Sequence, residues 1–175
     1  MFGSKRDEAR DQPFVEYVAA RRAKLYRTAY LICGDAHRAD DLVQTALAKA
    51  YVAWPRLEQA GNVDAYVRQI LVNAHVDETR RSWRRERPGL PEIDGATPAT
   101  EHEGHEDLWA ALRALAPGQR RVVVLRHYWG LSTEETAAEL GISPGTVKSQ
   151  TSDALAHLRR ALSEVGTGAD HDRAR

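Results

Sequence analysis

Apolar residues recur at helical spacing on both sides of a stretch that has almost no such periodicity. In the first half, three apolar stripes predict three helices. We expect the first helix to stop at Gly34, the second to be capped by Asp35 and to end at Pro55, and the third to be capped by Asp64. The stripes consist of Phe14, Val18, Leu25, Ala29 and Ile32, then of Leu42, Ala46, Ala50 and Trp54, and then of Val67, Ile70, Leu71 and Ala74.

The second half predicts four further helices. Leu108, Leu112 and Leu115 mark a short helix that ends near Pro117, and Pro117 is also suited to begin the next helix. Two shorter helices follow. No segment shows the alternation of a strand, although the β-branched run at 122–124 is a mild argument the other way. The fold class predicted is therefore all-α.

Residues 131–162 are typical of a helix-turn-helix. Ser132 followed by Glu135 matches a capping box, Gly141 suits a left-handed turn, and Ser143 is suited to cap a helix that begins at Pro144. In such a motif the second helix enters the major groove of DNA. Any two short amphipathic helices joined by glycine give a similar pattern, but the agreement of so many positions favours DNA binding.

The candidate base-reading residues are those that face away from the buried stripe of the second helix, together with its cap. Lys148 can bond guanine edges or a phosphate, and the hydroxyl groups can reach either. The candidates are Ser143, Thr146, Lys148, Ser149 and Ser152.

Charge is segregated along the chain, although the 25 basic and 25 acidic residues cancel. Residues 14–87 carry 13 basic and 9 acidic side chains, 88–105 carry four acidic and no basic ones, and 106–163 carry 7 basic and 6 acidic. The acidic stretch is rich in Pro, Gly and Thr and indicates a flexible linker. We therefore predict two small helical domains joined by a flexible acidic linker, with boundaries at 1–13 (tail), 14–88 (first domain), 89–105 (linker), 106–163 (second domain) and 164–175 (tail).

Several classes of protein and site are not supported by the sequence. No apolar run approaches the ~18 residues of a membrane span, and no secretory signal precedes the first helix, so we expect a cytoplasmic protein without a membrane partner. Cys33 is alone, and the four histidines at 102, 105, 127 and 157 have no metal-ligand spacing. No nucleophile motif or phosphate loop is present. We expect no enzyme activity, no catalytic residue, no metal, no cofactor and no small-molecule substrate.

Both halves resemble one known family. ADDLVQTALAKAYVAW (39–54) and NVDAYVRQILVNAHVDETRRSWRRE (62–86) resemble the sigma-2 domain of extracytoplasmic-function sigma factors, and LRALAPGQRRVVVLRHYWGLSTEETAAELGISPGTVKSQ (112–150) resembles their sigma-4 domain. The likeness spans about residues 14–163 and is greatest to an actinobacterial, SigE-like subgroup. It implies a factor that binds core RNA polymerase and directs promoter-specific initiation. Its sigma-2 domain would open the −10 element, and its sigma-4 domain would read the −35 element.

The resemblance implies a polymerase-docking helix. In the family the D-D-L-V-Q motif docks on the clamp helices of the largest polymerase subunit, and the corresponding residues here are Asp40, Asp41, Leu42 and Gln44. Two carboxylates early in a helix suit the helix dipole and offer acceptors to a partner's arginines. Helix-end capping on a solvated face is the alternative interpretation.

The resemblance also implies a site for the −10 element. Family members hold a flipped base in a loop that corresponds to about 56–63, and Asn73 matches a position that lines the pocket. A run of one-signed arginines follows, for which promoter phosphate is the natural counter-charge, while Trp83 in their midst is more simply a core anchor than a stacking residue. The −10 candidates are Asn62, Arg68, Asn73, Arg80, Arg81, Arg84 and Arg85.

The resemblance implies two further contacts with the polymerase: the flap is a binding partner, and the acidic linker runs toward the active-site cleft and the RNA exit path. Members of the family can also bind an anti-sigma factor, although no motif in this sequence identifies one. The recognition helix departs from the family pattern, since Gln150, Asp153 and His157 stand where arginine is frequent. Each lost arginine removes a phosphate or guanine contact, so we expect weak −35 binding.

We weigh three other functions against the sequence, of which the recombinase fails on chemistry. An operator-binding helix-turn-helix regulator would need a dimer surface or ligand pocket in the first half and leaves the arginine run unexplained. A recombinase with a helix-turn-helix tail lacks a recognisable catalytic motif. A decoy that docks on polymerase without initiating would agree with the departures in the recognition helix.

Overall fold

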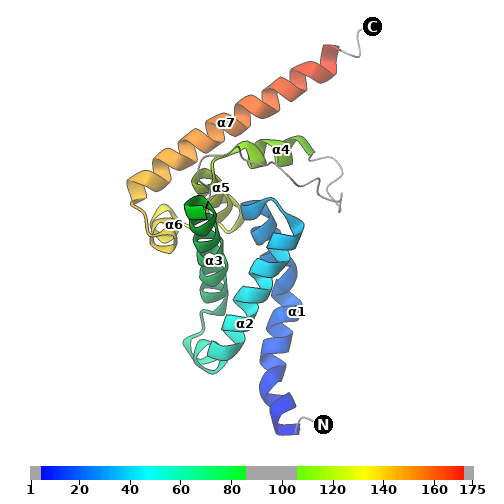
Figure 1. Cartoon of the computed structure of the whole chain (residues 1–175), viewed down its shortest axis with the longest axis vertical. Helices are drawn as coiled ribbons and strands as arrows, with labels where there is room; N and C mark the ends of the chain where they lie inside the picture. The colour runs from blue at the N-terminus through cyan, green and yellow to red at the C-terminus, as the bar shows by residue number, and fades with distance from the viewer. Residues whose placement is uncertain (1–4, 86–105, 172–175) are drawn as a thin grey trace. The chain divides into compact units, whose positions relative to one another are not determined.

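The chain folds into helices in two compact units. The computed structural model describes residues 5–85 and 106–171, with side chains for 11–81 and 106–163. One unit comprises residues 1–30 and 35–91, and the other comprises 31–34 and 92–175. No strand occurs within the described ranges, and the all-α prediction is confirmed (Figure 1). The predicted linker, 89–105, lies outside the described residues.

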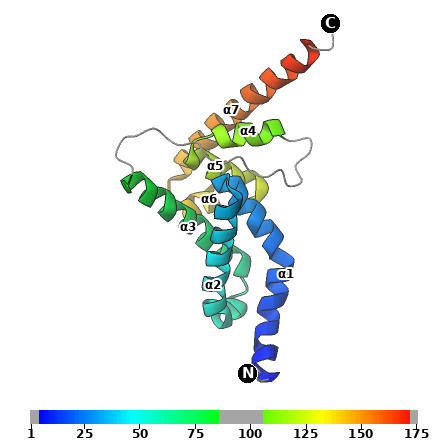
Figure 2. The same cartoon turned by 45° about the vertical axis from the view of Figure 1, so that its right-hand side comes forward.

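The first unit is built from α1 (Lys5–Cys33), α2 (Ala36–Ala60) and α3 (Val63–Arg85). The helices α2 and α3 lie side by side, as both views show (Figures 1 and 2). Asp35 caps α2 as predicted, because its carboxylate accepts a hydrogen bond from the backbone N–H of Arg38 at 2.8 Å. The predicted stripes supply much of the core, which includes Leu25, Ala29, Leu42, Val43, Ala46, Ala50, Trp54, Val67, Leu71 and Val72.

Two predicted helix ends are wrong. Pro55 lies inside α2, which continues to Ala60 and ends at Gly61, whose φ of +69° favours glycine. A proline inside a helix destabilises the helix by about 3 kcal/mol. The burial of Leu57 beyond it stabilises the folded unit by about 1.5–3 kcal/mol and so offsets much of this cost. Asp64 does not cap α3, because that helix already begins at Val63. The loop expected over 56–63 is therefore reduced to two residues.

Side chains of α1 tie the three helices of this unit together. The rings of Phe14 and Tyr17 lie 5.2 and 5.4 Å from the ring of Trp54, centroid to centroid. Arg21 pairs with Asp64 of α3 at 3.0 Å. Burial, and then the nearby Asp64 carboxylate, raise the pKa of the Tyr17 hydroxyl above its ordinary value. The aromatic contacts therefore hold α1 on α2, and the polar ones hold it on the first turn of α3.

The second unit is built around one long helix. It contains α4 (Glu106–Ala114), α5 (Pro117–Val123), the π-helical turn η1 (Val124–Tyr128), α6 (Thr133–Leu140) and α7 (Pro144–His171). The helices α4, α5 and α6 all pack against α7. α7 has 28 residues and reaches His171, so the expectation of a shorter last helix is wrong. α1 likewise begins at Lys5, inside the segment expected to be a tail.

The β-branched run is helical. Val122, Val123, Val124 and Leu125 are all buried, so their apolar side chains face the core of this unit rather than a sheet. The chain widens there into one π turn, in which the N–H of Trp129 donates to the carbonyl of Val124 at 3.1 Å. Packing against α7 thus overrides the strand preference of valine.

No described helix is long and apolar enough to cross a membrane. Within the described ranges, no three His, Cys, Asp or Glu side chains lie close enough together to hold a metal ion.

Candidate partner-binding and nucleic-acid interfaces

The predicted docking residues divide between the surface and the interior of α2. Asp41 and Gln44 are exposed, and they lie three residues apart on one face of the helix. Leu42 is only 6% exposed and packs in the core, so it cannot itself form a surface contact in this structure. Asp40 pairs with Arg22 of α1 at 3.1 Å. The surface that α2 offers a partner here therefore consists of Asp41 and Gln44.

Both carboxylates lie in the second turn of α2, since the first turn contains no acidic residue. The helix dipole acts mainly within the first turn, so it explains little of their presence. The pairing of Asp40 with Arg22 gives that residue a structural role between α1 and α2. The ion pairs among the described side chains join Arg21 to Asp64, Arg22 to Asp40 and Arg38 to Glu78, and the exposed Asp41 carboxylate is in none of them.

The −10 candidates on α3 also divide. Asn73, Arg80 and Arg81 are exposed, whereas Arg68 is 8% exposed and lies close enough to Tyr17 for its charge to affect that hydroxyl. The guanidinium of Arg68 is therefore inside the unit rather than at a DNA-facing surface. Asn62 precedes the first residue of α3 and is exposed. The helix extends through Arg84 and Arg85, whose side chains lie outside the described residues.

An exposed face of α3 contains two residues that the sequence did not single out. Tyr66 is 37% exposed, and Gln69 is exposed one turn further along. Steps of three and four residues place both on the face that runs from Asn62 to Asn73. The sequence did contain a sign of this face, namely amides and an aromatic ring spaced three and four residues apart. The spacing alone did not show which face of α3 is exposed. The result is a row of base-bonding and base-stacking side chains from Asn62 to Asn73. One turn further along, the same face carries the exposed acid Asp77, and the exposed Arg80 and Arg81 follow it.

The helix-turn-helix of α6 and α7 forms as predicted. The Ser132 N–H donates to the Glu135 carboxylate at 2.7 Å, and the Glu135 N–H donates to the Ser132 hydroxyl at 3.0 Å. The turn follows at Gly141, with a φ of +64°. Beneath it, Val147 of α7 packs against Val122 and Ala137. This packing fixes the buried side of α7 against the rest of the unit, so the opposite side of its first turns faces outward.

Not all predicted reading residues on α7 are equally available. The hydroxyls of Ser143 and Thr146 lie 2.8 Å apart, and the Ser143 hydroxyl also accepts the Thr146 N–H at 3.0 Å. The Ser149 hydroxyl donates to the Thr146 carbonyl at 3.1 Å. Lys148 and Ser152 are exposed. Lys148 is therefore the one cation among the predicted reading residues, and the first three hydroxyls already have partners within the helix start.

The three positions that depart from the family pattern have different surroundings. Gln150 is half-buried and its amide faces Gly118, where an added Cβ would come within 3.4 Å of it. Asp153 is exposed, and His157 is half-buried. Gln150 therefore packs against α5 instead of pointing outward, and Asp153 is the departure that would face phosphate.

We expect Ser132→Ala to lower the free energy of unfolding by about 1 kcal/mol, because one of the two capping-box hydrogen bonds is lost. Chemical denaturation followed by circular dichroism measures this. The matched control is Ser152→Ala, an exposed position within α7, where the change should stay within about 0.5 kcal/mol. Equal losses at both positions would contradict the role of the box.

Comparisons with known proteins agree with both units. Residues 17–85 match the family model described as Sigma-70 region 2, and residues 105–158 match the one described as Sigma-70, region 4. The chain is 45% identical over 153 residues to the RNA polymerase sigma-E factor of Streptomyces coelicolor, covering 85% of each protein. It is 32% identical over 173 residues to the ECF RNA polymerase sigma factor SigE of Mycolicibacterium smegmatis, covering 94% of this chain and 67% of that one.

Solved structures show the same architecture. The sigma factor RpoE of Bartonella quintana, crystallised with the anti-sigma factor NepR, is similar with a TM-score of 0.68 and 26% identity, over 87% of this chain and 98% of that one. CnrH in complex with the cytosolic domain of CnrY has a TM-score of 0.60 at 23% identity, over 88% and 90% of the two chains, and supports the fold.

Proposed function

The chain belongs to the sigma-70 family of RNA polymerase sigma factors, within its extracytoplasmic-function group, and on this premise we propose how its parts divide the work of initiation. A sigma factor binds core RNA polymerase and directs it to promoters. Residues 14–88 are assigned as the sigma-2 domain, 89–105 as the linker and 106–163 as the sigma-4 domain. The protein then acts in the cytoplasm, where its polymerase is, as an initiation factor with no chemistry of its own.

Core polymerase is held by the exposed face of α2 that carries Asp41 and Gln44. A surface carboxylate outside the described ion pairs is suited to a partner's arginine, and the neighbouring amide can both donate and accept. Leu42 supports this face from below, because its burial fixes the rotation of α2. Asp40 supports it from the side through Arg22.

The −10 element is opened and read along α3. Tyr66 can stack on an extruded base, and the amides of Asn62, Gln69 and Asn73 can bond base edges. Arg80 and Arg81, at the far end of this face, have an exposed position suited to the DNA phosphates. Arg68, which is buried, acts as a positioning residue within the unit and not as a DNA contact.

The observation that carries this function is the presence of both sigma regions in order, together with an exposed polar face on α2 and another on α3. An operator-binding regulator is not favoured, because it does not account for sigma-70 region 2 in the first unit. An anti-sigma factor is proposed as a further partner, since the similar sigma factor RpoE of Bartonella quintana was crystallised with one.

Run-off transcription with purified core polymerase, with and without this protein, tests the function. Promoter-specific transcripts that need the protein are expected. Association with core polymerase without transcripts would favour the decoy, and the absence of any association would reject the sigma assignment.

We expect weak −35 binding that depends on one cation. Lys148→Ala should reduce the slope of log affinity against log salt by about 1, because one phosphate or base contact is lost and the neighbouring hydroxyls carry no charge. Fluorescence anisotropy of −35 DNA fragments with the whole protein, at several salt concentrations, measures it. The control Lys49→Ala removes an exposed lysine from α2 instead. A steep slope that both variants leave unchanged would contradict the proposal.

A further inference from the structure

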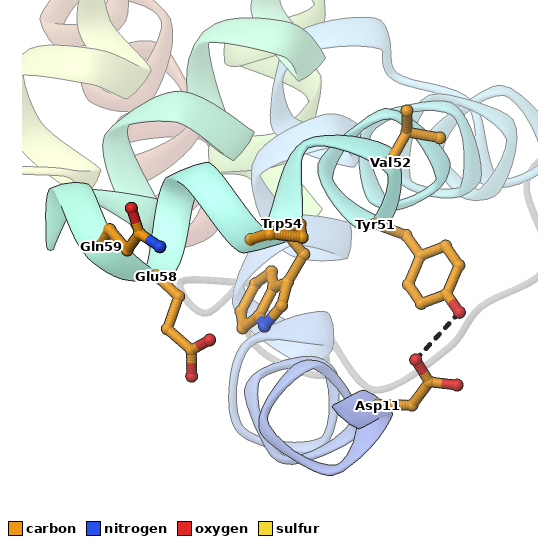
Figure 3. A pocket seen from close by; sticks show the side chains of 7 residues that line it. Asp11, Tyr51, Val52, Trp54, Glu58 and Gln59 are labelled. Carbon is orange, nitrogen blue, oxygen red and sulfur yellow. Dashed lines mark hydrogen bonds between the residues drawn. The ribbon is translucent and has the colours of Figure 1, made fainter. Parts of the chain in front are cut away.

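A groove in the first unit belongs to a surface that already has a proposed role. It lies between the start of α1 and the second half of α2, and Figure 3 shows the hydrogen-bonded Tyr51 and Asp11 beside the ring of Trp54. Because α2 is the helix assigned to polymerase docking, the groove adds no separate site. The acid Asp153 of α7 is different, since it is exposed in the second unit and no contact is yet assigned to it.

The packing of α7 determines where Asp153 lies on the helix. Val147, Ala154 and Leu158 are buried on one side of α7. At about 3.6 residues per turn, Ser149 and Asp153 lie one turn apart on the side away from these residues. Both are exposed. Asp153 therefore lies on the side of α7 that a recognition helix turns toward DNA.

The charge of Asp153 is not balanced within the unit. The ion pairs among the described side chains all lie in the first unit, so none of them includes Asp153. One turn away on the same edge of the helix, Ser149 carries no charge and His157 is half-buried. DNA phosphate repels a carboxylate at a position where the family frequently has arginine. The Asp153 carboxylate is therefore suited to a hydrogen-bond donor and not to the DNA backbone.

The major groove of DNA offers two donors to a carboxylate. They are the N4 amino group of cytosine and the N6 amino group of adenine. Adenine also presents its N7 acceptor beside the amino group, and this acceptor repels a carboxylate. Guanine presents only acceptors, and thymine presents an acceptor and a methyl group. An aspartate on the reading side is thus best suited to cytosine, less to adenine, and least to guanine or thymine.

The neighbours of Asp153 leave room for this contact. The outward side chains around it belong to Ser149, Ser152 and Ala156, which are all short and exposed. Short neighbours allow the backbone of α7 to approach the base edges, as the short side chain of aspartate requires. Lys148 stands five residues earlier, roughly 7.5 Å along the helix axis, so the two charges address different base pairs.

We propose that Asp153 is a specificity-determining residue of the −35 site and that its carboxylate accepts a hydrogen bond from the N4 amino group of a cytosine. The proposal rests on the proposed function, because it requires α7 in the major groove of −35 DNA. The departure from arginine then exchanges a phosphate or guanine contact for a cytosine contact. It changes which −35 sequence is selected as well as how tightly the DNA is held.

Promoters that differ only in the −35 element test this role. Holoenzyme is assembled from purified core polymerase and the whole protein, and its affinity is measured for all four bases at each −35 position. The wild-type protein should prefer cytosine over guanine or thymine at one position by about 5- to 50-fold. Asp153→Ala should reduce this preference to less than about twofold and leave the preferences at the other positions unchanged.

Two further variants separate base reading from the loss of a surface charge. Asp153→Asn should shift the preference at the same position from cytosine toward adenine, because an amide bonds adenine at both N6 and N7. A cytosine preference as strong as that of the wild type would overturn the role of the carboxylate. The control Asp107→Ala removes an exposed carboxylate from α4 and should leave every preference unchanged. Circular dichroism confirms that each variant is folded.

The same measurements show which part of the argument fails. Uniformly tighter binding of Asp153→Ala to every sequence, with a steeper salt dependence, would mean that the carboxylate only repels phosphate, and would overturn the proposal. Unchanged affinity for every sequence would overturn it as well. In both cases a −35 preference in the wild type leaves the proposed function standing. If the wild-type holoenzyme initiates without any −35 preference, −35 reading by α7 is rejected together with the proposal. If it binds no promoter, the sigma function itself has failed.

Discussion

Asp41→Ala combined with Gln44→Ala is expected to lower the affinity for core RNA polymerase by at least about 30-fold, the effect of losing an interface hot spot. Both side chains are exposed on α2, so their removal leaves the core intact. The loss should appear mainly as faster dissociation, because short-range contacts set the lifetime of a complex. Equilibrium binding of labelled protein to purified core polymerase measures it, with thermal unfolding as a check on folding.

The matched control removes one amide and one carboxylate from another helix. Gln12 and Glu16 hydrogen-bond to each other at 3.0 Å on the exposed side of α1, and replacing both with alanine should leave core binding within about twofold. Leu42 is left out of the test because burial makes Leu42→Ala a stability variant, at about 2–5 kcal/mol. Normal core binding by the Asp41, Gln44 variant would show that polymerase docks elsewhere.

The second large effect is expected at the −10 element. Tyr66→Ala with Asn73→Ala should slow open-complex formation by at least about 30-fold, since stacking on one base is worth about 1–3 kcal/mol and the lost amide adds to it. Both residues are exposed on the same face of α3, so folding should be preserved. Fluorescence of a base analogue in the −10 strand follows promoter opening by the holoenzyme.

Two measurements separate base reading from polymerase docking. Affinity for core polymerase should stay within about twofold in the Tyr66, Asn73 variant, because its side chains lie on α3 and not on α2. Tyr66→Phe, which keeps the ring and loses the hydroxyl, should restore most of the opening rate. If Tyr66→Phe is as slow as Tyr66→Ala, the hydroxyl and not the stacking face is what matters, and the stacking role is wrong.

Most of the fold follows from local patterns in the chain. The apolar stripes, the Asp35 cap, the Ser132 capping box and the turn at Gly141 are all local, and each forms where it was expected. Pro55 shows where local rules fail, because α2 continues past it to Ala60 and buries Leu57 in the core. The placement of α7 also depends on other elements, since α4, α5 and α6 all pack against it.

The sequence predicted which helices carry the candidate sites, but it identified only some of the individual residues that are exposed there. Family motifs assigned docking to the segment that forms α2 and −10 reading to the segment that forms α3, but they did not distinguish exposed from buried members. Leu42 and Arg68 have the residue types of the motif and yet lie inside the unit, whereas Tyr66 and Gln69 lie on the surface without having been singled out.

By itself the sequence determined the helical class, the two regions, the helix-turn-helix and the membership of the family, because periodicity, caps and motif spacing are properties of neighbouring residues. The tertiary structure alone decided which members of each motif a partner can touch. It turned α2 so that Asp41 and Gln44 face outward, and it brought Asp11 of α1 to Tyr51 of α2. Contacts between residues 40 positions apart depend on how helices pack, and no local pattern records that packing.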